Sequence, residues 1–177
     1  EISACLVGSE MCIRDRSSND QSYLNYNLIE TVGSTEEVPV LVLPTDTAIE
    51  FRLASSDVSH AFWVPEFLFK RDAYSHPEMN QQERSFQIEE ITETGSFVGR
   101  CAEMCGTYHA MMNFEIRAVT PDQFREYMDF RHNNPEASNS EALEAIGEEP
   151  FATSTRPFNS DRTGTRDGNN AVDNVGI

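Results

Sequence analysis

Residues 101–112 place soft metal-binding side chains together in one short segment. Cys101 and Cys105 supply two thiols, His109 supplies an imidazole and Met112 supplies a thioether. Thiolate and thioether sulfur favour copper over hard cations such as magnesium or calcium, whereas imidazole suits several metals. A mononuclear blue-copper site uses a single cysteine, so a second thiolate allows two copper ions to share both sulfurs. The segment therefore predicts a binuclear copper centre.

The second imidazole for such a centre must come from another part of the chain. His60, in the segment Asp57-Val58-Ser59-His60, is the candidate. His76 and His132 have no thiol or histidine nearby in sequence, so we interpret them as surface residues. The long separation between His60 and Cys101 is typical of a metal site assembled from two loops of a β-sandwich. The fold must therefore create the geometry.

Two other uses of these side chains stay open from the residues alone. Even cysteine counts are common in exported domains, so Cys101 and Cys105 could form a disulfide, or all four cysteines a disulfide framework. Two cysteines and two histidines could also bind zinc. Structural zinc sites usually pair their ligands two to four residues apart at both ends, however, and His60 stands alone.

Length and charge limit the classes of function. The chain has 177 residues, enough for one domain with extensions and a core that does not depend on disulfides. Its formal net charge is −17, from 30 acidic and 13 basic residues. Nucleic-acid binding relies on clustered Lys and Arg, so this balance argues against it. It favours a cationic or transient protein partner, although an acidic surface that serves only solubility explains most of these carboxylates equally well.

The beginning of the chain does not read as part of the domain. Residues 1–16 lack the cationic start and apolar core of a signal peptide. They are similar to translated sequencing-adapter sequence, so we expect a non-native segment in which Cys5 and Cys12 are accidental. The chain also starts with Glu1, and we expect it to be a fragment. No apolar run reaches the length of about 18 residues that a membrane-spanning helix needs.

The elements that must position the ligands read as short strands. Apolar and polar residues alternate in several of them, the period expected of half-buried strands; Phe114, Ile116 and Ala118, for example, alternate with Glu115 and Arg117. Gly99 lets the backbone approach a neighbour closely just before the metal segment. The expected strands are 39–43, 49–53, 86–88, 95–100 and 114–118. Short strands separated by turns predict a β-sandwich or barrel.

Two helices and a tail are expected after these strands. Thr120, Pro121 and Gln123 form the start of a helix with a capping box, and Phe124, Tyr127 and Met128 follow as a core-facing stripe. A second helix is expected from about Ser138, with Glu141 three residues later, to Gly147. The expected organisation is a β domain over 17–120, a helical extension over 121–147 and an extended or disordered tail over 148–177.

The ligand pattern resembles that of a known family, subunit II of the haem-copper cytochrome c oxidases. The family pattern Cys-x-Glu-x-Cys-Gly-x-x-His-x-x-Met is met from Cys101 to Met112, and its Asp-Val-x-His segment is met at residues 57–60. The resemblance extends over roughly residues 20–157, and the segment 66–72 resembles actinobacterial members, which work in an assembly with a cytochrome bc complex. It implies a cupredoxin-like Greek-key β-sandwich.

The resemblance also implies a ligand set. Five residues would supply side-chain ligands to a dinuclear copper A centre: His60, Cys101, Cys105, His109 and Met112. Glu103 would have two roles, because its backbone carbonyl completes the coordination of one copper while its carboxylate reaches a magnesium ion at the interface with subunit I. Magnesium is commonly bound through one or two carboxylates.

The implied function is electron transfer within a respiratory oxidase. Electrons from cytochrome c, or from a fused or associated c-type haem domain, would pass to haem a in subunit I, where oxygen is reduced to water with proton pumping. No residue of this chain would be catalytic. The implied partners are subunit I, other oxidase subunits, and cytochrome c or a cytochrome bc complex. The implied location is a bacterial plasma membrane, reached through upstream spans, with this domain on the outer, periplasmic-side face.

The chain lacks one feature of the family pattern, and two other functions stay open beside the oxidase. The Trp-rich strand through which family members usually receive electrons is missing, and Trp63 is not that residue, so the point of electron input stays open. The copper A domain of a nitrous oxide reductase shares the ligand loop, but residues 62–65 and Glu103 favour the oxidase. A free-standing copper-binding or copper-delivery protein is the second alternative.

Overall fold

The computed structural model describes residues 12–14, 30–34, 37–55, 57–77 and 79–157. Most of the expected non-native segment, and the expected tail from residue 158 onward, lie outside the described residues. The strands are β1 (Cys12–Arg14), β2 (Glu30–Val32), β3 (Val40–Pro44), β4 (Ile49–Arg52), β5 (His60–Val64), β6 (Phe69–Ala73), β7 (Ser85–Ile88), β8 (Gly95–Cys101) and β9 (Asn113–Val119). The helices are α1 (Pro121–Asn133) and α2 (Asn139–Ala145), with short 3-10 turns η1 (Pro65–Phe67) and η2 (His109–Met111).

The strands form a mostly β fold, as predicted. A five-stranded sheet has the order β3-β9-β8-β5-β6, and β4 pairs with β7 in a second, two-stranded sheet. Strand β3 runs parallel to β9, whereas the other neighbours in the large sheet are antiparallel. Strand β1 pairs with β2, so residues 12–14 of the expected non-native segment form backbone pairs with residues 30–32. The five predicted strands are all present, whereas β1, β2, β5 and β6 were not predicted.

An aromatic core joins the two sheets. Phe51 of β4 stacks on Phe86 of β7 with ring centroids 4.8 Å apart, and Phe62 of β5 lies 5.0 Å from Phe114 of β9. Phe51 and Phe62 meet across the sandwich at 5.2 Å. A side chain at Gly99 would collide with the ring of Phe114, because a Cβ atom there would lie 2.1 Å from it. The predicted close approach at Gly99 is therefore confirmed, and it fixes β8 against β9 just before Cys101.

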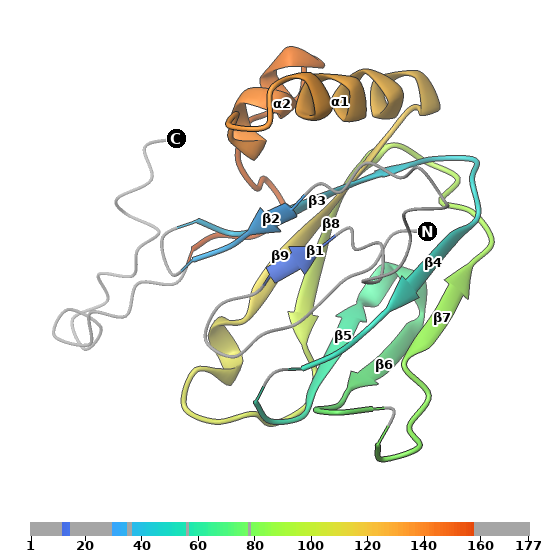
Figure 1. The fold of residues 1–177 in the computed structure, drawn as a ribbon, viewed down its shortest axis with the longest axis vertical. Helices are drawn as coiled ribbons and strands as arrows, with labels where there is room; N and C mark the ends of the chain where they lie inside the picture. Colours follow the sequence, from blue (N-terminus) through green and yellow to red (C-terminus); the bar gives the residue numbers. More distant parts are fainter. Residues whose placement is uncertain (1–11, 15–29, 35–36, 56, 78, 158–177) are drawn as a thin grey trace, which may run out of the picture.

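The two helices cover the end of the fold opposite the loop between β8 and β9 (Figure 1). Thr120 and Gln123 form a capping box at the start of α1, and Ser138 and Glu141 form another at the start of α2. Both helix starts match their predictions. Tyr127 and Leu143 pack with Val40 and Val42 of β3 in a second apolar cluster. No described helix combines the length and hydrophobicity needed to cross a membrane.

Strand β9 differs from its prediction as a half-buried strand. The side chains of Glu115 and Arg117 are 0% and 2% exposed, so both faces of the strand are buried. Arg117 Nη2 donates to Glu115 Oε1 at 2.5 Å, and Arg117 also donates to the carbonyls of Glu149 and Phe151. The backbone N–H of Thr153 donates to Glu115 Oε2 at 2.7 Å. The polar face is thus covered by the segment after α2, whose residues 149–153 are tied to the sheet by these hydrogen bonds.

Candidate metal centre

The predicted ligands come together at the end of the sandwich away from α1 and α2 (Figure 1). His60 begins β5 and Cys101 ends β8. These strands are antiparallel with Phe62 opposite Cys101, and Ala102 N–H donates to the Ala61 carbonyl at 3.1 Å, so both ligands lie at the same sheet end. The long separation in sequence is bridged by strand pairing, as the sequence analysis required.

The remaining ligands lie in the loop that connects β8 to β9. Cys101 N–H donates to the Met112 carbonyl at 3.0 Å, which closes this loop at its base. His109 N–H donates to the Gly106 carbonyl at 3.1 Å and begins the turn η2. This turn directs the His109 ring back toward the cysteines.

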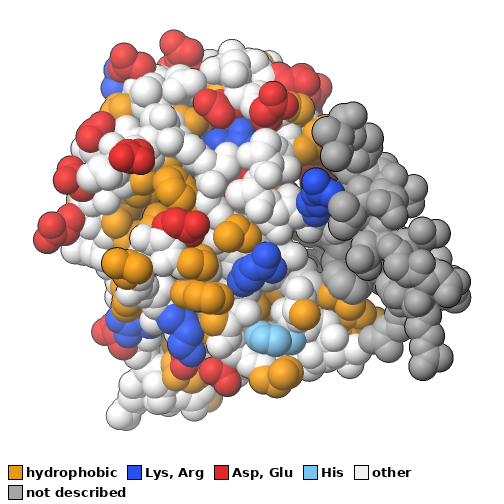
Figure 2. Space-filling view, turned by 180° about the vertical axis from the view of Figure 1, so that it is seen from behind, with side chains coloured by type: hydrophobic (Ala, Val, Ile, Leu, Met, Phe, Trp, Pro, Cys, Tyr) orange, Lys and Arg blue, Asp and Glu red, His pale blue; other side chains and the backbone are white. Residues whose placement is uncertain are grey.

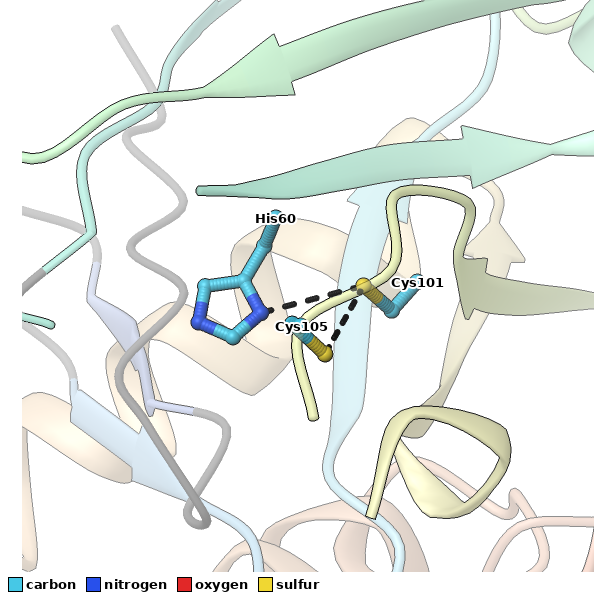
Figure 3. Close-up of side chains that lie close together, drawn as sticks. All are labelled: His60, Cys101 and Cys105. Atoms are coloured by element: carbon cyan, nitrogen blue, oxygen red, sulfur yellow. Dashed lines mark hydrogen bonds between the residues drawn. The ribbon is translucent and has the colours of Figure 1, made fainter. Parts of the chain in front are cut away.

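The two cysteine sulfurs form the centre of the cluster. Cys101 Sγ and Cys105 Sγ are 3.7 Å apart, far beyond the roughly 2.05 Å of a disulfide, and both thiols are free. His60 Nδ1 lies 3.7 Å from Cys101 Sγ, and His109 Nδ1 lies 3.5 Å from Cys105 Sγ. Figure 3 shows His60, Cys101 and Cys105 pointing toward one another from separate elements. The structure thus favours free thiols over the disulfide alternative.

Two weaker donors complete the cluster. The Glu103 carbonyl oxygen lies 3.2 Å from Cys101 Sγ, and Met112 Sδ lies 3.4 Å from Cys105 Sγ. Each sulfur therefore has an imidazole nitrogen and a weaker donor within reach. Structural zinc sites are almost always tetrahedral with four ligands, so this set offers more donors than one zinc ion needs. It suits a pair of soft metal ions.

Burial divides the site into an inner and an outer side. His60, Cys101 and Met112 are buried, whereas Cys105 and His109 are partly exposed. Burial, followed by the neighbouring Cys101 sulfur, raises the pKa of the Cys105 thiol to about 12. Without metal, Cys105 is therefore a thiol at neutral pH. Metal binding must displace these protons, since the thiolate is the ligand form.

Asp57 contacts the ring nitrogen of His60 that faces away from the sulfurs. His60 Nε2 lies 2.8 Å from Asp57 Oδ1. Partial burial raises the pKa of Asp57, but hydrogen bonds from His60 and Ser55 outweigh this and lower the pKa overall. The sequence analysis placed Asp57 in a family motif but gave it no role. Apart from that motif, its sequence signal is an acidic residue three positions before a candidate ligand.

The carboxylate of Glu103 points to a polar cluster on β6. Lys70 Nζ lies 3.6 Å from Glu103 Oε2 and donates to Asp72 Oδ1 at 3.0 Å. The Tyr74 hydroxyl donates to Asp72 Oδ2 at 3.1 Å. Glu103 thus has two contacts: its backbone carbonyl lies beside the Cys101 sulfur, and its carboxylate lies beside the Lys70 ammonium group. The sequence analysis missed Lys70, because a lysine on an unpredicted strand carries no signal of this contact.

The other predicted surface residues lie where expected, since His76 and His132 are both exposed. Trp63 is 37% exposed and lies opposite Arg100 in the sheet. On the face opposite that of Figure 1, acidic side chains follow the upper edge and one side, and hydrophobic side chains gather in the middle (Figure 2). The acidic composition is thus displayed on the surface.

Comparison with known proteins gives the family. Residues 21–119 match the family model described as the periplasmic domain of cytochrome c oxidase subunit II. The chain belongs to this family. It is 68% identical over 161 residues to cytochrome c oxidase subunit 2 of Corynebacterium diphtheriae, an alignment that covers 91% of this chain and 44% of the relative. It is 55% identical over 150 residues to the subunit 2 of Mycobacterium tuberculosis, covering 85% of this chain and 41% of that relative.

The chain spans less than half the length of these relatives, and the resemblance to actinobacterial members is confirmed. Among solved structures, the periplasmic domain of cytochrome oxidase subunit II from Bradyrhizobium japonicum matches with a TM-score of 0.56 at 23% identity, covering 77% of this chain and 94% of that one. That match supports the cupredoxin-like fold.

The family implies copper A as the bound group, and the donor set of two thiols, two imidazoles, a thioether and a carbonyl fits it.

Proposed function

We propose that this chain is the electron-transfer domain of a respiratory cytochrome c oxidase. Electrons from cytochrome c, or from a fused or associated c-type haem domain, pass through a copper A centre in this domain to haem a in subunit I. Oxygen reduction and proton pumping take place in other subunits. The proposed metal ligands are His60, Cys101, Cys105, His109, Met112 and the backbone carbonyl of Glu103.

One observation carries this proposal. Two free cysteine sulfurs lie 3.7 Å apart, and each has an imidazole nitrogen within 3.7 Å. A single-copper site of the blue type needs one thiolate, so the second sulfur fits a shared pair of metal ions. When bound, copper A supplies an unpaired electron delocalised over two ions, which permits electron transfer with little structural adjustment.

The residues around the cluster keep that geometry fixed. Cys101 lies at the end of a seven-residue strand and pairs with Phe62 of β5, so its backbone is held by the sheet. The hydrogen bond from Cys101 N–H to the Met112 carbonyl fixes the two ends of the ligand loop together. The buried side chains of His60 and Met112 exclude water from the inner side. A rigid, dry environment of this kind tunes a metal and limits its rearrangement.

The exposed side of the cluster is where we place the partner subunit. Cys105 and His109 are partly exposed, and Met104 and Tyr108 in the same loop are 75% and 51% exposed. Exposed apolar side chains beside a functional site are typical of interaction surfaces. We infer that this loop faces subunit I, with the domain on the outer, periplasmic-side face of a bacterial plasma membrane. The family description as a periplasmic domain supports that location.

The magnesium part of the proposal concerns Glu103. Its carboxylate is 44% exposed, so it is available to an ion at an interface. One or two protein carboxylates are usual for magnesium. The ammonium group of Lys70, 3.6 Å from this carboxylate, repels a second cation there. We therefore infer that Lys70 turns toward Asp72 alone when Glu103 binds magnesium.

Replacement of Cys105 by Ser tests the proposed centre. Removal of one shared sulfur should abolish the purple colour and the multiline paramagnetic signal of an electron shared by two coppers. The matched control is the double variant Cys5→Ser/Cys12→Ser, which also removes thiols and should leave both spectra unchanged. The proposal fails if the Cys105→Ser protein keeps the binuclear spectrum, or if the control loses it.

A further inference from the structure

We propose that Asp57 is a positioning residue: its carboxylate fixes the ring of His60, with the ring proton on Nε2, so that Nδ1 faces the two cysteine sulfurs before metal binds. This inference rests on the proposed copper function and deepens it. It gives a role to a side chain that is not itself a ligand.

The donor and acceptor chemistry of the contact sets the tautomer of His60. An ionised carboxylate can only accept hydrogen bonds, so His60 Nε2, 2.8 Å from Asp57 Oδ1, must be the donor. In a neutral imidazole the other nitrogen then carries a lone pair. That nitrogen, Nδ1, lies 3.7 Å from Cys101 Sγ on the side where a metal would bind. Histidine ligands commonly donate their second nitrogen to such a partner.

Burial makes the orientation of the ring costly to change. The His60 side chain is only 2% exposed, so water cannot readily replace a lost partner at Nε2. Rotation of the ring by half a turn would place ring carbons against the carboxylate and against the Cys101 sulfur. A buried N–H without a partner costs about 1–3 kcal/mol, which disfavours that rotamer.

Asp57 is itself held in place, although its side chain is 44% exposed. The Ser55 hydroxyl, whose one proton is shared between Asp57 Oδ1 at 3.0 Å and the Val58 carbonyl, also accepts from Asp57 N–H at 3.3 Å. Ser55 is buried, and its own N–H donates to the Tyr74 carbonyl at 3.0 Å. A continuous chain of contacts therefore runs from the end of β6 through Ser55 and Asp57 to His60.

The second histidine has no comparable support. His109 is partly exposed, and of its two ring nitrogens only Nδ1 has a hydrogen-bond contact within the described part of the chain, with Cys105 Sγ at 3.5 Å. The two imidazoles are therefore unequal: both ring nitrogens of His60 have contacts within this domain, whereas among the described residues only one ring nitrogen of His109 does. An exposed carboxylate that served only as a docking charge would not need the contact with a buried ring.

The test is nitrogen NMR of the histidine rings in the reduced, metal-free 177-residue chain, at about pH 8, where an ordinary imidazole is neutral. His60 should be in the Nε2–H form. Asp57→Asn should preserve this form, because an amide oxygen still accepts, whereas Asp57→Ala should populate both tautomers. Glu93→Gln is the control, because it also removes one negative charge but lies just before the start of β8, at the strand end away from Cys101. This variant should leave the spectrum unchanged.

The wild-type spectrum alone can overturn the inference, so its fate does not depend on the folding of a variant. An Nδ1–H form of His60, or an Nε2–H form that persists fully in folded Asp57→Ala, contradicts a positioning role. Copper titration of the same samples separates this inference from the proposed function. Asp57→Ala should bind copper about 10–100-fold more weakly than wild type or Glu93→Gln. If wild type binds no copper pair while the tautomer result holds, the proposed function fails and Asp57 keeps its role.

Discussion

Met112 is the one proposed side-chain ligand whose donor is neither a thiol nor an imidazole. Its side chain is buried, and its Sδ atom lies 3.4 Å from Cys105 Sγ. An axial thioether tunes a copper site more than it holds the metal. In the proposed ligand set, two sulfurs and two imidazoles would remain when this thioether is lost. We therefore expect Met112 to tune the site rather than to hold the metal.

Replacement of Met112 by Leu, which conserves volume, tests that assignment. The variant should keep the binuclear paramagnetic signal but show a higher reduction potential, because loss of a donor destabilises the oxidised form. The measurement is a potentiometric titration of the copper-loaded domain. Asp46, in the turn between β3 and β4, offers a remote control position, and Asp46→Asn should leave the potential unchanged. Failure of Met112→Leu to bind copper would show that the thioether holds the metal.

Individual ligands were predictable from sequence to different degrees. Cys101, Cys105, His109 and Met112 lie in one segment, so their soft donors reveal the site without any fold. His60 required a second segment and a family pattern. The contacts of Asp57 and Lys70 could not be predicted, because a carboxylate or an ammonium group gains its meaning only when strand pairing places it beside a ligand.

Strand β9 connects the ligand loop to the helices and contains a buried ion pair. Arg117 is 2% exposed and forms an ion pair with the fully buried Glu115. Removal of one partner from a buried ion pair costs about 3–5 kcal/mol, because the other charge stays buried without compensation. Arg117→Met should lower the free energy of unfolding by about that amount in urea denaturation.

A double variant distinguishes the cost of leaving the Glu115 carboxylate without its partner from the cost of losing the packing of the Arg117 side chain. Glu115→Gln keeps an acceptor for Thr153 N–H while it removes the negative charge. Glu115→Gln/Arg117→Met should therefore recover much of the stability lost in Arg117→Met. The assignment is wrong if the single variant is as stable as wild type, or if the double variant is the less stable of the two.

The same strand shows where prediction of elements succeeds and where it stops. Capping residues are local, so Thr120 and Ser138 locate both helix starts from sequence alone. The burial of Arg117 depends on residues more than thirty positions later in the chain, which no local pattern records. Strand β5 escaped prediction because Ala61, Phe62 and Val64 are buried on both faces, so alternation is lost.

At the scale of the whole molecule, charge is the dominant feature. The net charge of −17 should attract a cationic electron donor before contact. Salt shortens the range of this attraction from about 30 Å at 0.01 M to about 8 Å at 0.15 M. The second-order rate of electron uptake from a cationic cytochrome c should therefore fall about tenfold or more over that range. Stopped-flow mixing measures this rate.

A neutral small-molecule reductant provides the control for this measurement. Its rate should change little with salt, because it carries no charge for the acidic surface to attract. A rate with cytochrome c that rises or stays constant with salt would show that these carboxylates serve solubility rather than docking. The copper spectrum should be the same at every salt concentration, since three of the proposed ligands, His60, Cys101 and Met112, are buried.

The most direct test of the proposed binuclear copper centre is the number and kind of metal ions bound per chain. Reduced protein should be reconstituted with copper salts, freed of loose metal, and measured by elemental analysis for copper and zinc together with paramagnetic resonance. We expect two copper ions per chain and a multiline signal from one electron shared between them. One copper ion per chain with a four-line signal, or zinc bound in its place, would contradict the shared-sulfur centre.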